Sequence, residues 1–332
     1  MKIAIVKLSA MGDIIHAMGA LQFIKKHLPH SQIDWITEQA FVGVLEDNPH
    51  IDTILPTNLK ALKKNKLKLL SEIKGVMSYA DNSYDIVIDA QGLIKSAMTG
   101  KLLSSGNLWG FSKDSIREKE ASFFYNHSVE IAYHENTIDR NMRVLSEPFG
   151  FEITPQDILA KEPFLYYQKD THIESYISAT QKNIIFIVGS TWESRNYPKE
   201  HFATIANTLQ ENTIVIWGSQ EEREVAEWIA YTSPYATVIP RLSYNSLKAL
   251  IAKCDLLIGN DTGPTHIAWG LNVPSITIFG PTPVNRVYQT PINKVIKSDS
   301  PIDHYKLNKN DFSIRDIDPL EIVAMSRQLL DD

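Results

Sequence analysis

The sequence predicts an α/β fold with two Rossmann-like domains, and three observations support this prediction. Short β-branched apolar runs alternate with segments of helical periodicity, which is typical of parallel sheets covered by helices. A polar, irregular stretch at about residues 166–182 interrupts the alternation, which then starts again. The length of 332 residues suits two domains of ordinary size. We therefore expect domains at residues 1–165 and 166–315, with a ligand cleft between them.

The N-terminal half begins with a strand, because the apolar run KIAIVKL occupies residues 2–8. Apolar residues near helical spacing then predict a helix over residues 13–27. Further short apolar runs predict strands at residues 33–36, 51–55 and 85–89. Helical patterns between and after these runs predict helices at residues 59–77 and 93–103.

The C-terminal half repeats the alternation. Apolar runs such as NIIFIV and TIVIW predict strands at residues 183–188, 213–217, 254–258 and 275–279. Helical periodicity predicts helices at residues 199–210, 221–230, 245–253 and 262–270. An amphipathic pattern predicts a final helix at residues 319–330.

The composition excludes several classes of protein. With 43% hydrophobic and 22% charged residues, the chain is not mainly disordered. The single cysteine, Cys254, excludes a disulfide framework and a Cys-rich zinc site, and its apolar surroundings predict a buried thiol. A net charge of −6 argues against general nucleic-acid binding. No apolar run approaches the roughly 20 residues that span a bilayer, and the first residues do not form a signal peptide, so we expect a cytoplasmic protein.

The segment LKALKKNKLKLL at residues 59–70 is locally basic. Its lysines are Lys60, Lys63, Lys64, Lys66 and Lys68. Five like charges repel one another unless counter-charge is present, so the segment favours an anionic partner, either a nucleic acid or an acidic glycolipid at a membrane surface. A solvated helical face is the alternative interpretation.

The loop KLSAMGD follows the first predicted strand and ends at Asp13. It lacks G-x-G-x-x-G, which disfavours a nicotinamide-dependent oxidoreductase. Asp13 starts the next helix, where the helix dipole favours an ionised carboxylate. It is therefore either a general base at the mouth of the expected cleft or a first-turn acid with a structural role only.

The loop GNDTGPTH follows the predicted CDLLI strand and predicts a phosphate site. Asp261 or Thr262 can cap the next helix, and Gly263 allows close approach of a ligand to the backbone. We expect the amides of Thr262, Gly263 and Thr265 to point beyond the strand end. His266 either donates to a phosphate or packs inside the helix.

Two further loops should face the same ligand. After NIIFIV, the hydroxyls of Ser190 and Thr191 and the cation of Arg195 suit a diphosphate. After TIVIW, the sequence GSQEE offers Glu221 and Glu222 as acceptors for ribose hydroxyls. Acids are common in a first helical turn, so a structural role for these two residues remains the alternative.

Three segments occur together and in order: KLSAMGDIIHA at the N-terminus, DAQGLIKSA at residues 89–97, and GNDTGPTHIAWGLNVPSITIFGPT at residues 259–282. Through them the chain resembles the family 9 glycosyltransferases over essentially its whole length. The D-T-G-P-x-H element is the most specific of the matches. DAQGLIKSA and IREKEASFFY at residues 116–125 favour the type that adds the first heptose of lipopolysaccharide over the type that adds the second.

The resemblance implies the GT-B architecture: two Rossmann-like domains facing a central cleft, with a C-terminal helix at residues 316–332 packing back on the N-terminal domain. It implies inverting transfer of L-glycero-D-manno-heptose from ADP-heptose to the first Kdo of Kdo2-lipid A. No cofactor and no metal site are implied, and Mg²⁺ is not obligatory. The expected protein is a monomer, peripheral at the inner face of the cytoplasmic membrane, with no nucleic-acid partner.

The resemblance also implies site residues, with Asp13 as the catalytic base and Arg195, where the family usually has lysine, as the cation at the leaving group. The implied donor-binding residues are Ser190, Thr191, Glu222, Leu242, Asp261, Thr262, Gly263 and His266. The implied acceptor-binding residues are Lys60, Lys63, Lys64, Lys95, Arg117 and Lys119. The alternatives are the second heptosyltransferase type, another GT-B nucleotide-sugar transferase or epimerase, and, more remotely, a nucleic-acid-binding protein.

Overall fold

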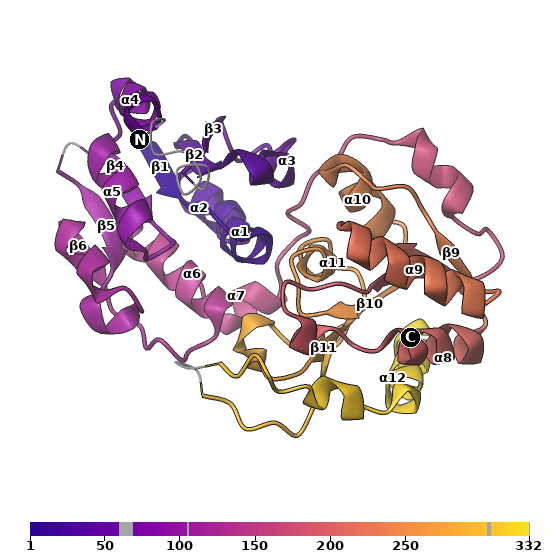
Figure 1. The fold of residues 1–332 in the computed structure, drawn as a ribbon. Coiled ribbons are helices and arrows are strands. Elements are labelled where there is room, and N and C mark those ends of the chain that lie inside the picture. The colour runs from indigo at the N-terminus through magenta and orange to yellow at the C-terminus, as the bar shows by residue number, and fades with distance from the viewer. Residues whose placement is uncertain (60–68, 105, 304–306, 332) are drawn as a thin grey trace. The chain divides into compact units, whose positions relative to one another are not determined.

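The computed structural model describes residues 1–59, 69–104, 106–303 and 307–331 (Figure 1). The chain divides into two compact units, Met1–Tyr166 and Tyr167–Asp332. The division lies one residue from the boundary expected from the sequence. Each unit contains a six-stranded sheet in which neighbouring strands pair in parallel, so each unit is an α/β domain of the Rossmann type.

The first sheet has the strand order β3-β2-β1-β4-β5-β6. Its strands are β1 (Lys2–Val6), β2 (Gln32–Glu38), β3 (Thr53–Thr57), β4 (Ile86–Asp89), β5 (Leu108–Phe111) and β6 (His127–Val129). The strands β2 and β3 lie on one side of β1, and the later strands β4, β5 and β6 lie on its other side. The carboxyl ends of β1 and β4 therefore flank the switch point, where such sheets bind ligands.

The helices of the first unit are α1 (Met11–Met18), α2 (Leu21–His27), α3 (Val42–Leu45), α4 (Leu69–Tyr79), α5 (Ile94–Leu103), α6 (Thr137–Ser146) and α7 (Pro155–Leu159). The helix expected over residues 13–27 is two helices. Gly19, a poor helix former, ends the first of them, and the second starts two residues later.

The second sheet has the order β12-β11-β10-β7-β8-β9. Its strands are β7 (Asn183–Ile187), β8 (Asn212–Ile216), β9 (Ala236–Val238), β10 (Leu256–Asn260), β11 (Ser275–Phe279) and β12 (Asn293–Lys297). Counted from its own first strand, it repeats the order of the first sheet. Its switch point lies between β7 and β10, whose buried residues pair directly.

The helices of the second unit are α8 (Lys199–Leu209), α9 (Gln220–Thr232), α10 (Tyr244–Ile251), α11 (Thr265–Gly270) and α12 (Pro319–Asp331). Short 3₁₀ helices complete the chain: η1 (Gln39–Phe41), η4 (Ala80–Asn82), η5 (Lys113–Ser115), η6 (Lys119–Phe124), η7 (Glu147–Phe149), η8 (Thr171–Tyr176), η9 (Glu193–Arg195), η10 (Val284–Arg286) and η11 (Ser313–Asp316).

The position of α12 corrects an expectation from the sequence. We expected this helix to pack back on the N-terminal domain, but it packs against α8 in the second unit. Its buried residues Ile322, Val323 and Leu329 belong to the same apolar core as Phe202 and Ile205 of α8. The apolar stripe of α12 therefore has its burial partner within the second unit.

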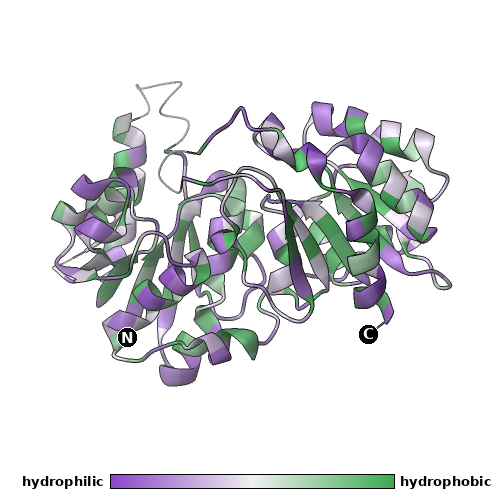
Figure 2. Ribbon diagram, turned by 90° about the horizontal axis from the view of Figure 1, so that it is seen from below, coloured by the Kyte–Doolittle hydropathy of each residue, from purple (hydrophilic) through white to green (hydrophobic). Residues whose placement is uncertain are grey.

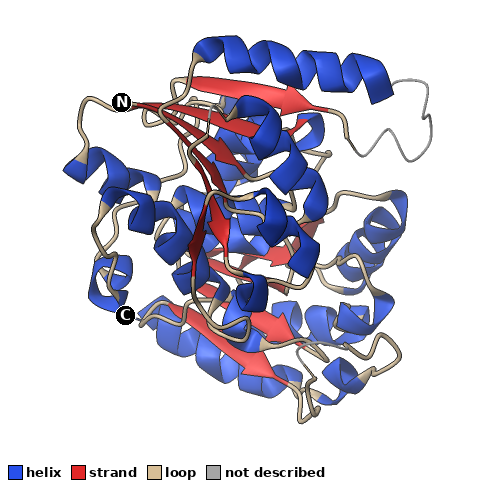
Figure 3. Cartoon of the chain, turned by 90° about the vertical axis from the view of Figure 1, so that its left-hand side faces the viewer, coloured by secondary structure: helices blue, strands red, loops and turns tan. Residues whose placement is uncertain are grey.

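The strands of both sheets are largely apolar, whereas the helices contain both polar and apolar residues (Figure 2). Helices cover the sheets, as the view in Figure 3 shows. On one face of the first sheet, Ala4, Val6 and Leu8 share a core with Val76 of α4 and Leu103 of α5. Among the described residues, no helix is long and apolar enough to cross a membrane.

Candidate functional site

The candidate site in the second unit is built on the loops that leave β7 and β10. Asn260, the last residue of β10, is fully buried and holds both ends of the β7 loop. Its Nδ2 donates to the carbonyl of Val188 at 2.8 Å, and its Oδ1 accepts from the amide of Tyr197 at 3.0 Å. The conformation of the intervening residues 189–196 is thereby tied to the sheet edge.

Asp261, which is buried, and Arg195, which is partly buried, form an ion pair at the end of β10, with Arg195 Nη2 2.6 Å from Asp261 Oδ2. Arg195 also donates to the main-chain carbonyl of Asp261, and Thr282 Oγ1 donates to Asp261 Oδ2 at 3.3 Å. His266 Nε2 lies 3.5 Å from the other carboxylate oxygen. The structure therefore brings together Arg195, Asp261 and His266, three of the residues predicted from the sequence.

The surroundings of this pair control its ionisation. Burial alone would raise the pKa of Asp261, but the hydrogen bond to His266 and the charge of Arg195 outweigh it and hold the pKa well below its usual range. Burial lowers the pKa of the Arg195 guanidinium, and the charge of Asp261 opposes that shift. Two opposite charges thus stabilise each other at the sheet edge.

The backbone before α11 differs in part from the prediction. The amide of Thr265 donates to the carbonyl of Thr262 at 3.1 Å, so it closes the turn and does not point at a ligand as expected. Thr262 and Gly263 are half-buried just ahead of the helix. At Gly259, a Cβ atom would lie 2.7 Å from Ile187 Cβ and 2.8 Å from Thr265 Oγ1, so only glycine fits this close approach.

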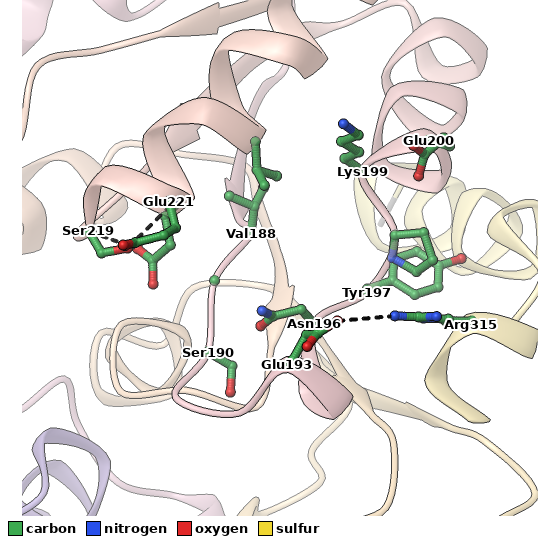
Figure 4. A pocket seen from close by; sticks show the side chains of 14 residues that line it. Val188, Ser190, Glu193, Asn196, Tyr197, Lys199, Glu200, Ser219, Glu221 and Arg315 are labelled. Carbon is green, nitrogen blue, oxygen red and sulfur yellow. Dashed lines mark hydrogen bonds and ion pairs between the residues drawn. The ribbon is translucent and has the colours of Figure 1, made fainter. Parts of the chain in front are cut away.

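A pocket of about 750 Å³ lies beside the β7 loop in the second unit (Figure 4). The β7 loop, the start of α8, the first turn of α9 and Arg315 line it. Of the predicted donor residues, Ser190 and Glu222 line the pocket. Arg315 Nη2 lies 3.5 Å from Glu193 Oε1, which connects η11 to the β7 loop.

Glu222 caps its own helix. Its Oε2 accepts from the amides of Gly218 and Ser219 at 2.6 and 3.3 Å, and its own amide donates to Ser219 Oγ at 3.2 Å. Its side chain also fills the space beside Gly189, where a Cβ atom would lie 2.1 Å from the Glu222 carboxyl carbon. The neighbouring Glu221 is exposed, and its pKa is lowered by a hydrogen bond from Ser219.

The β7 loop contains buried polar atoms without a hydrogen-bond partner: Ser190 Oγ, Ser194 Oγ, Arg195 Nε and Asn196 Oδ1. Each such atom costs about 1–3 kcal/mol, so a cluster of four within seven residues is unusual in a folded domain. These atoms lie where the switch-point rule places a ligand. A ligand that carries both oxygen acceptors and hydroxyl donors would satisfy them, because Arg195 Nε donates and Asn196 Oδ1 accepts.

Asp13 lies at the corresponding sheet edge of the first unit, in the first turn of α1 as predicted. Its Oδ2 accepts from the amide of Ala10 at 3.2 Å, so it also caps the helix. The preceding loop is held by Gln91 Oε1, which accepts from the amides of Leu8 and Ser9 at 3.1 and 3.0 Å. Gln91 therefore fixes the backbone that leads into the helix carrying Asp13.

Two buried charges adjoin this loop. Lys7 Nζ donates to the carbonyl of Ala90 at 2.7 Å and to Asn141 Oδ1 at 3.0 Å. Burial lowers the pKa of Lys7, while the negative charges of Asp13 and Asp89 oppose that shift. Burial raises the pKa of Asp89, although hydrogen bonds from Tyr125, at 2.7 Å, and from other donors favour its charged form.

Sequence reasoning assigned no role to Lys7, Asp89, Gln91 or Asn260. The sequence did contain a signal for them: each is a charged or carboxamide residue at or just after the end of an apolar run, and the ends of the central strands form the switch point. Cys254, in contrast, is buried as predicted, and burial raises the pKa of its thiol. The described residues contain no cluster of three or more His, Cys, Asp or Glu suited to a metal ion.

The predicted acceptor residues are only partly described. Lys60, Lys63 and Lys64 lie outside the described residues. Lys95 Nζ lies 3.6 Å from the carboxylate of Glu38. Lys119 Nζ lies 3.1 Å from the carboxylate of Asp114, and Arg117 is exposed. The segment of Arg117 and Lys119 contacts α5, because η6 packs on α5 and the Glu118 carboxylate accepts from the amide of Ile94.

Comparison with known proteins decides the family. The model of glycosyltransferase family 9, the heptosyltransferase family, matches residues 78–309. The chain belongs to glycosyltransferase family 9. This family 9 chain is 36% identical to lipopolysaccharide heptosyltransferase 1 of Campylobacter coli, over 100% of both chains. It is 29% identical to lipopolysaccharide heptosyltransferase 1 of Pseudomonas aeruginosa, over 85% of this chain and 79% of the relative.

A solved structure gives the same fold. The Escherichia coli heptosyltransferase WaaC, solved with ADP-2-deoxy-2-fluoro heptose, superposes with a TM-score of 0.79 over 99% of each chain, at 24% sequence identity. The predicted resemblance and the predicted fold class, α/β with two Rossmann-like domains of GT-B type, are confirmed. This family 9 protein is a glycosyltransferase.

Proposed function

We propose that this family 9 glycosyltransferase transfers L-glycero-D-manno-heptose from ADP-heptose to the first Kdo of Kdo2-lipid A, in synthesis of the lipopolysaccharide inner core. The observation that carries the proposal is the cluster of unpartnered buried polar atoms in the β7 loop, beside the Arg195–Asp261 pair at a switch point. The identity of 36% over both whole chains with a lipopolysaccharide heptosyltransferase 1 supports the choice of sugar and acceptor.

The second unit would bind the donor. Ser190 Oγ and Arg195 Nε have no partner and would donate to the diphosphate, together with the hydroxyl of Thr191. Thr262 and Gly263 would offer their amides, and His266 would bind a phosphate oxygen. Glu222, whose Oε2 is held by the start of α9, would accept from the ribose through Oε1, and Leu242 would contact the adenine.

The chemistry would be a single displacement with inversion. Asp13 takes the proton from the acceptor hydroxyl as that oxygen bonds to the anomeric carbon. The bond from the anomeric carbon to the phosphate oxygen breaks, and ADP leaves from the opposite face with the electron pair. Arg195 and the β7 loop hydroxyls stabilise the charge that grows on the diphosphate. The proposal requires no cofactor and no obligatory Mg²⁺.

The first unit would bind the acceptor. Kdo2-lipid A is anionic, so it supplies counter-charge for the lysine segment, including Lys60, Lys63 and Lys64, and for Lys95, Arg117 and Lys119. Because the acceptor is a lipid, we place the enzyme in the cytoplasm, as a monomer bound peripherally to the inner membrane, with no nucleic-acid partner.

A donor and acceptor screen tests the proposal. The purified protein is assayed with ADP-heptose, a UDP-sugar and a GDP-sugar against Kdo2-lipid A, and with ADP-heptose against mono-heptosylated Kdo2-lipid A. We expect turnover with ADP-heptose and Kdo2-lipid A. Turnover on the mono-heptosylated acceptor alone would assign the second heptosyltransferase type, and preference for a UDP- or GDP-sugar would refute the donor.

A further inference from the structure

Helix α5 has its apolar and small residues in an unusual distribution. Its buried face consists mainly of small side chains, including Ser96, Ala97 and Gly100. At Gly100 a Cβ atom would lie 2.8 Å from Leu108 Cδ1, which shows how closely this face approaches the sheet. The large apolar residues point outward: Ile94, Met98 and Leu102 are 37%, 50% and 38% exposed. A helix that only covers a sheet normally has the opposite pattern.

The neighbouring elements extend this apolar surface. On α4, Leu70 and Met77 are 71% and 51% exposed, and on η6 Phe123 is 76% exposed. Helix α5 packs against both α4 and η6, and the three elements contribute to one core on the same face of the first sheet. Their outward sides therefore form one surface. Of the eleven large apolar side chains exposed in the described part of the chain, six lie on it.

Lysines border these apolar residues. Successive helical positions turn by about 100°, so Lys95 and Lys101 flank the Ile94–Met98–Leu102 stripe on its two sides. Lys74 lies between Leu70 and Met77 on the outer face of α4 and is exposed. Helices α4 and α5 together carry three lysines and one acid, Glu72, whose carboxylate accepts from the amide of Asn58. The element η6 adds Lys119 and Glu120, so the three elements have two more lysines than acids. The surface is thus apolar in its centre and cationic at its edges.

We propose that this outward surface of α4, α5 and η6 docks the enzyme on an anionic phospholipid bilayer. The inference deepens the proposed function and rests on it, because a lipid acceptor requires the enzyme to work at a membrane. The apolar side chains enter the boundary between headgroups and acyl chains, while the lysines extend their charged ends to the headgroups. A contiguous patch of exposed apolar side chains marks an interaction site, and the bordering lysines favour a negatively charged partner surface.

Vesicle co-sedimentation tests the docking surface on the full-length protein. The vesicles contain no acceptor and are either pure phosphatidylcholine or phosphatidylcholine with roughly one-third phosphatidylglycerol. We expect binding to the anionic vesicles and about tenfold weaker binding for the Met98→Glu/Leu102→Glu double variant. Lys74→Gln/Lys101→Gln should weaken binding to anionic vesicles and make it less sensitive to salt.

A matched control separates the surface from a general charge effect. Leu159→Glu/Leu320→Glu makes the same charge change at side chains that are 53% and 55% exposed on other elements, α7 and α12. It should bind vesicles as the wild type does. Equal loss of binding in both double variants would overturn the proposal. The proposal would also be overturned if the Met98→Glu/Leu102→Glu protein bound vesicles normally. If, in addition, the wild type sedimented as a dimer and this variant as a monomer, the surface would be assigned to contact with a second copy of the chain.

The failure of this inference is distinguishable from failure of the proposed function. The wild type and the Met98→Glu/Leu102→Glu and Leu159→Glu/Leu320→Glu variants are assayed with ADP-heptose and a water-soluble, deacylated Kdo acceptor. Turnover on this acceptor should equal that of the wild type, because none of the substituted residues belongs to the proposed donor or acceptor site. For the wild-type protein, activity without binding to the anionic vesicles would refute the docking surface alone, whereas vesicle binding without any heptose transfer would refute the proposed function alone.

Discussion

Asp13 combines a structural and a proposed chemical role, and one substitution separates them. The carboxamide introduced by Asp13→Asn would keep an oxygen to accept from the Ala10 amide but could not take a proton. We expect kcat to fall by about 10²–10⁴-fold. The KM for ADP-heptose and the melting temperature should stay near those of the wild type. Steady-state kinetics and a thermal melt measure both, and a kcat close to the wild-type value would refute the base assignment.

Asp261 should stabilise the second unit in a pH-dependent way. Asp261→Asn leaves Arg195 buried without a counter-charge, which costs about 3–5 kcal/mol. Because the folded-state pKa of Asp261 is lowered, its stabilising contribution is complete above the ordinary aspartate value of about 3.9 and is lost as the pH falls from there through the folded-state pKa.

Denaturant unfolding of the wild type and of Asp261→Asn, at a series of pH values, measures this difference. The gap in unfolding free energy between the two proteins should be constant near neutral pH and narrow in acid. Thr282→Val is a matched control, because it removes a hydrogen bond to the same carboxylate without changing a charge. A gap that widens in acid would contradict the assigned direction.

Single residues were predictable where they lie in a local pattern. Asp13 and Asp261 each lie within five residues of the end of an apolar run, and the structure places both at sheet edges. Asn260 and Gln91 were not predicted, because their hydrogen-bond partners are 72 and 83 positions away in the sequence. The ion pair between Arg195 and Asp261 was missed for the same reason. The sequence analysis assigned the positive charge of Arg195 to the diphosphate alone, whereas in the structure the carboxylate of Asp261 balances it.

At the scale of elements, the β7 loop depends on Asn260. Asn260→Ala removes the bonds to Val188 and Tyr197, so the loop should lose its fixed conformation. We expect the Kd for ADP to rise about tenfold, since roughly 1.4 kcal/mol of site organisation is lost. Titration calorimetry with ADP measures this. Asn293→Ala removes comparable buried bonds in the same sheet and is the control; an equal rise in Kd for both variants would contradict the assignment.

Elements with a continuous apolar run were predictable, such as β7 and β10, whose residues are all buried. The strands β6 and β9 were not predicted, because they span three residues each and are partly exposed. The strand β12 has the sequence NKVIK, in which polar residues interrupt the apolar pattern. The helix α6 was not predicted, although its buried residues Ile138, Met142 and Leu145 stand at helical spacing; it begins at an Asn136 cap, whose side chain accepts from the amide of Ile138 at 2.8 Å.

At the scale of the molecule, α12 packs in the second unit, so we predict that a substitution in α12 destabilises that unit and not the first. Ile322→Ala creates a cavity in the core shared with α8 and should cost about 2–5 kcal/mol. Hydrogen exchange should accelerate in α8, β10 and β11 and remain unchanged in β1 and β2. Val144→Ala, at a buried side chain of the first unit, is the control and should accelerate exchange in the first unit only. Faster exchange in β1 and β2 for Ile322→Ala would contradict the position of the helix.

The repeated strand order has a consequence for how this enzyme can be altered. Each sheet has its own switch point, its own core and an almost equal length of chain, divided between Tyr166 and Tyr167. In the proposed function, the acceptor and the nucleotide sugar bind to different units. A chimera joined at that point, with its second half taken from a transferase that uses another nucleotide sugar, should exchange the donor while keeping Asp13 and the acceptor.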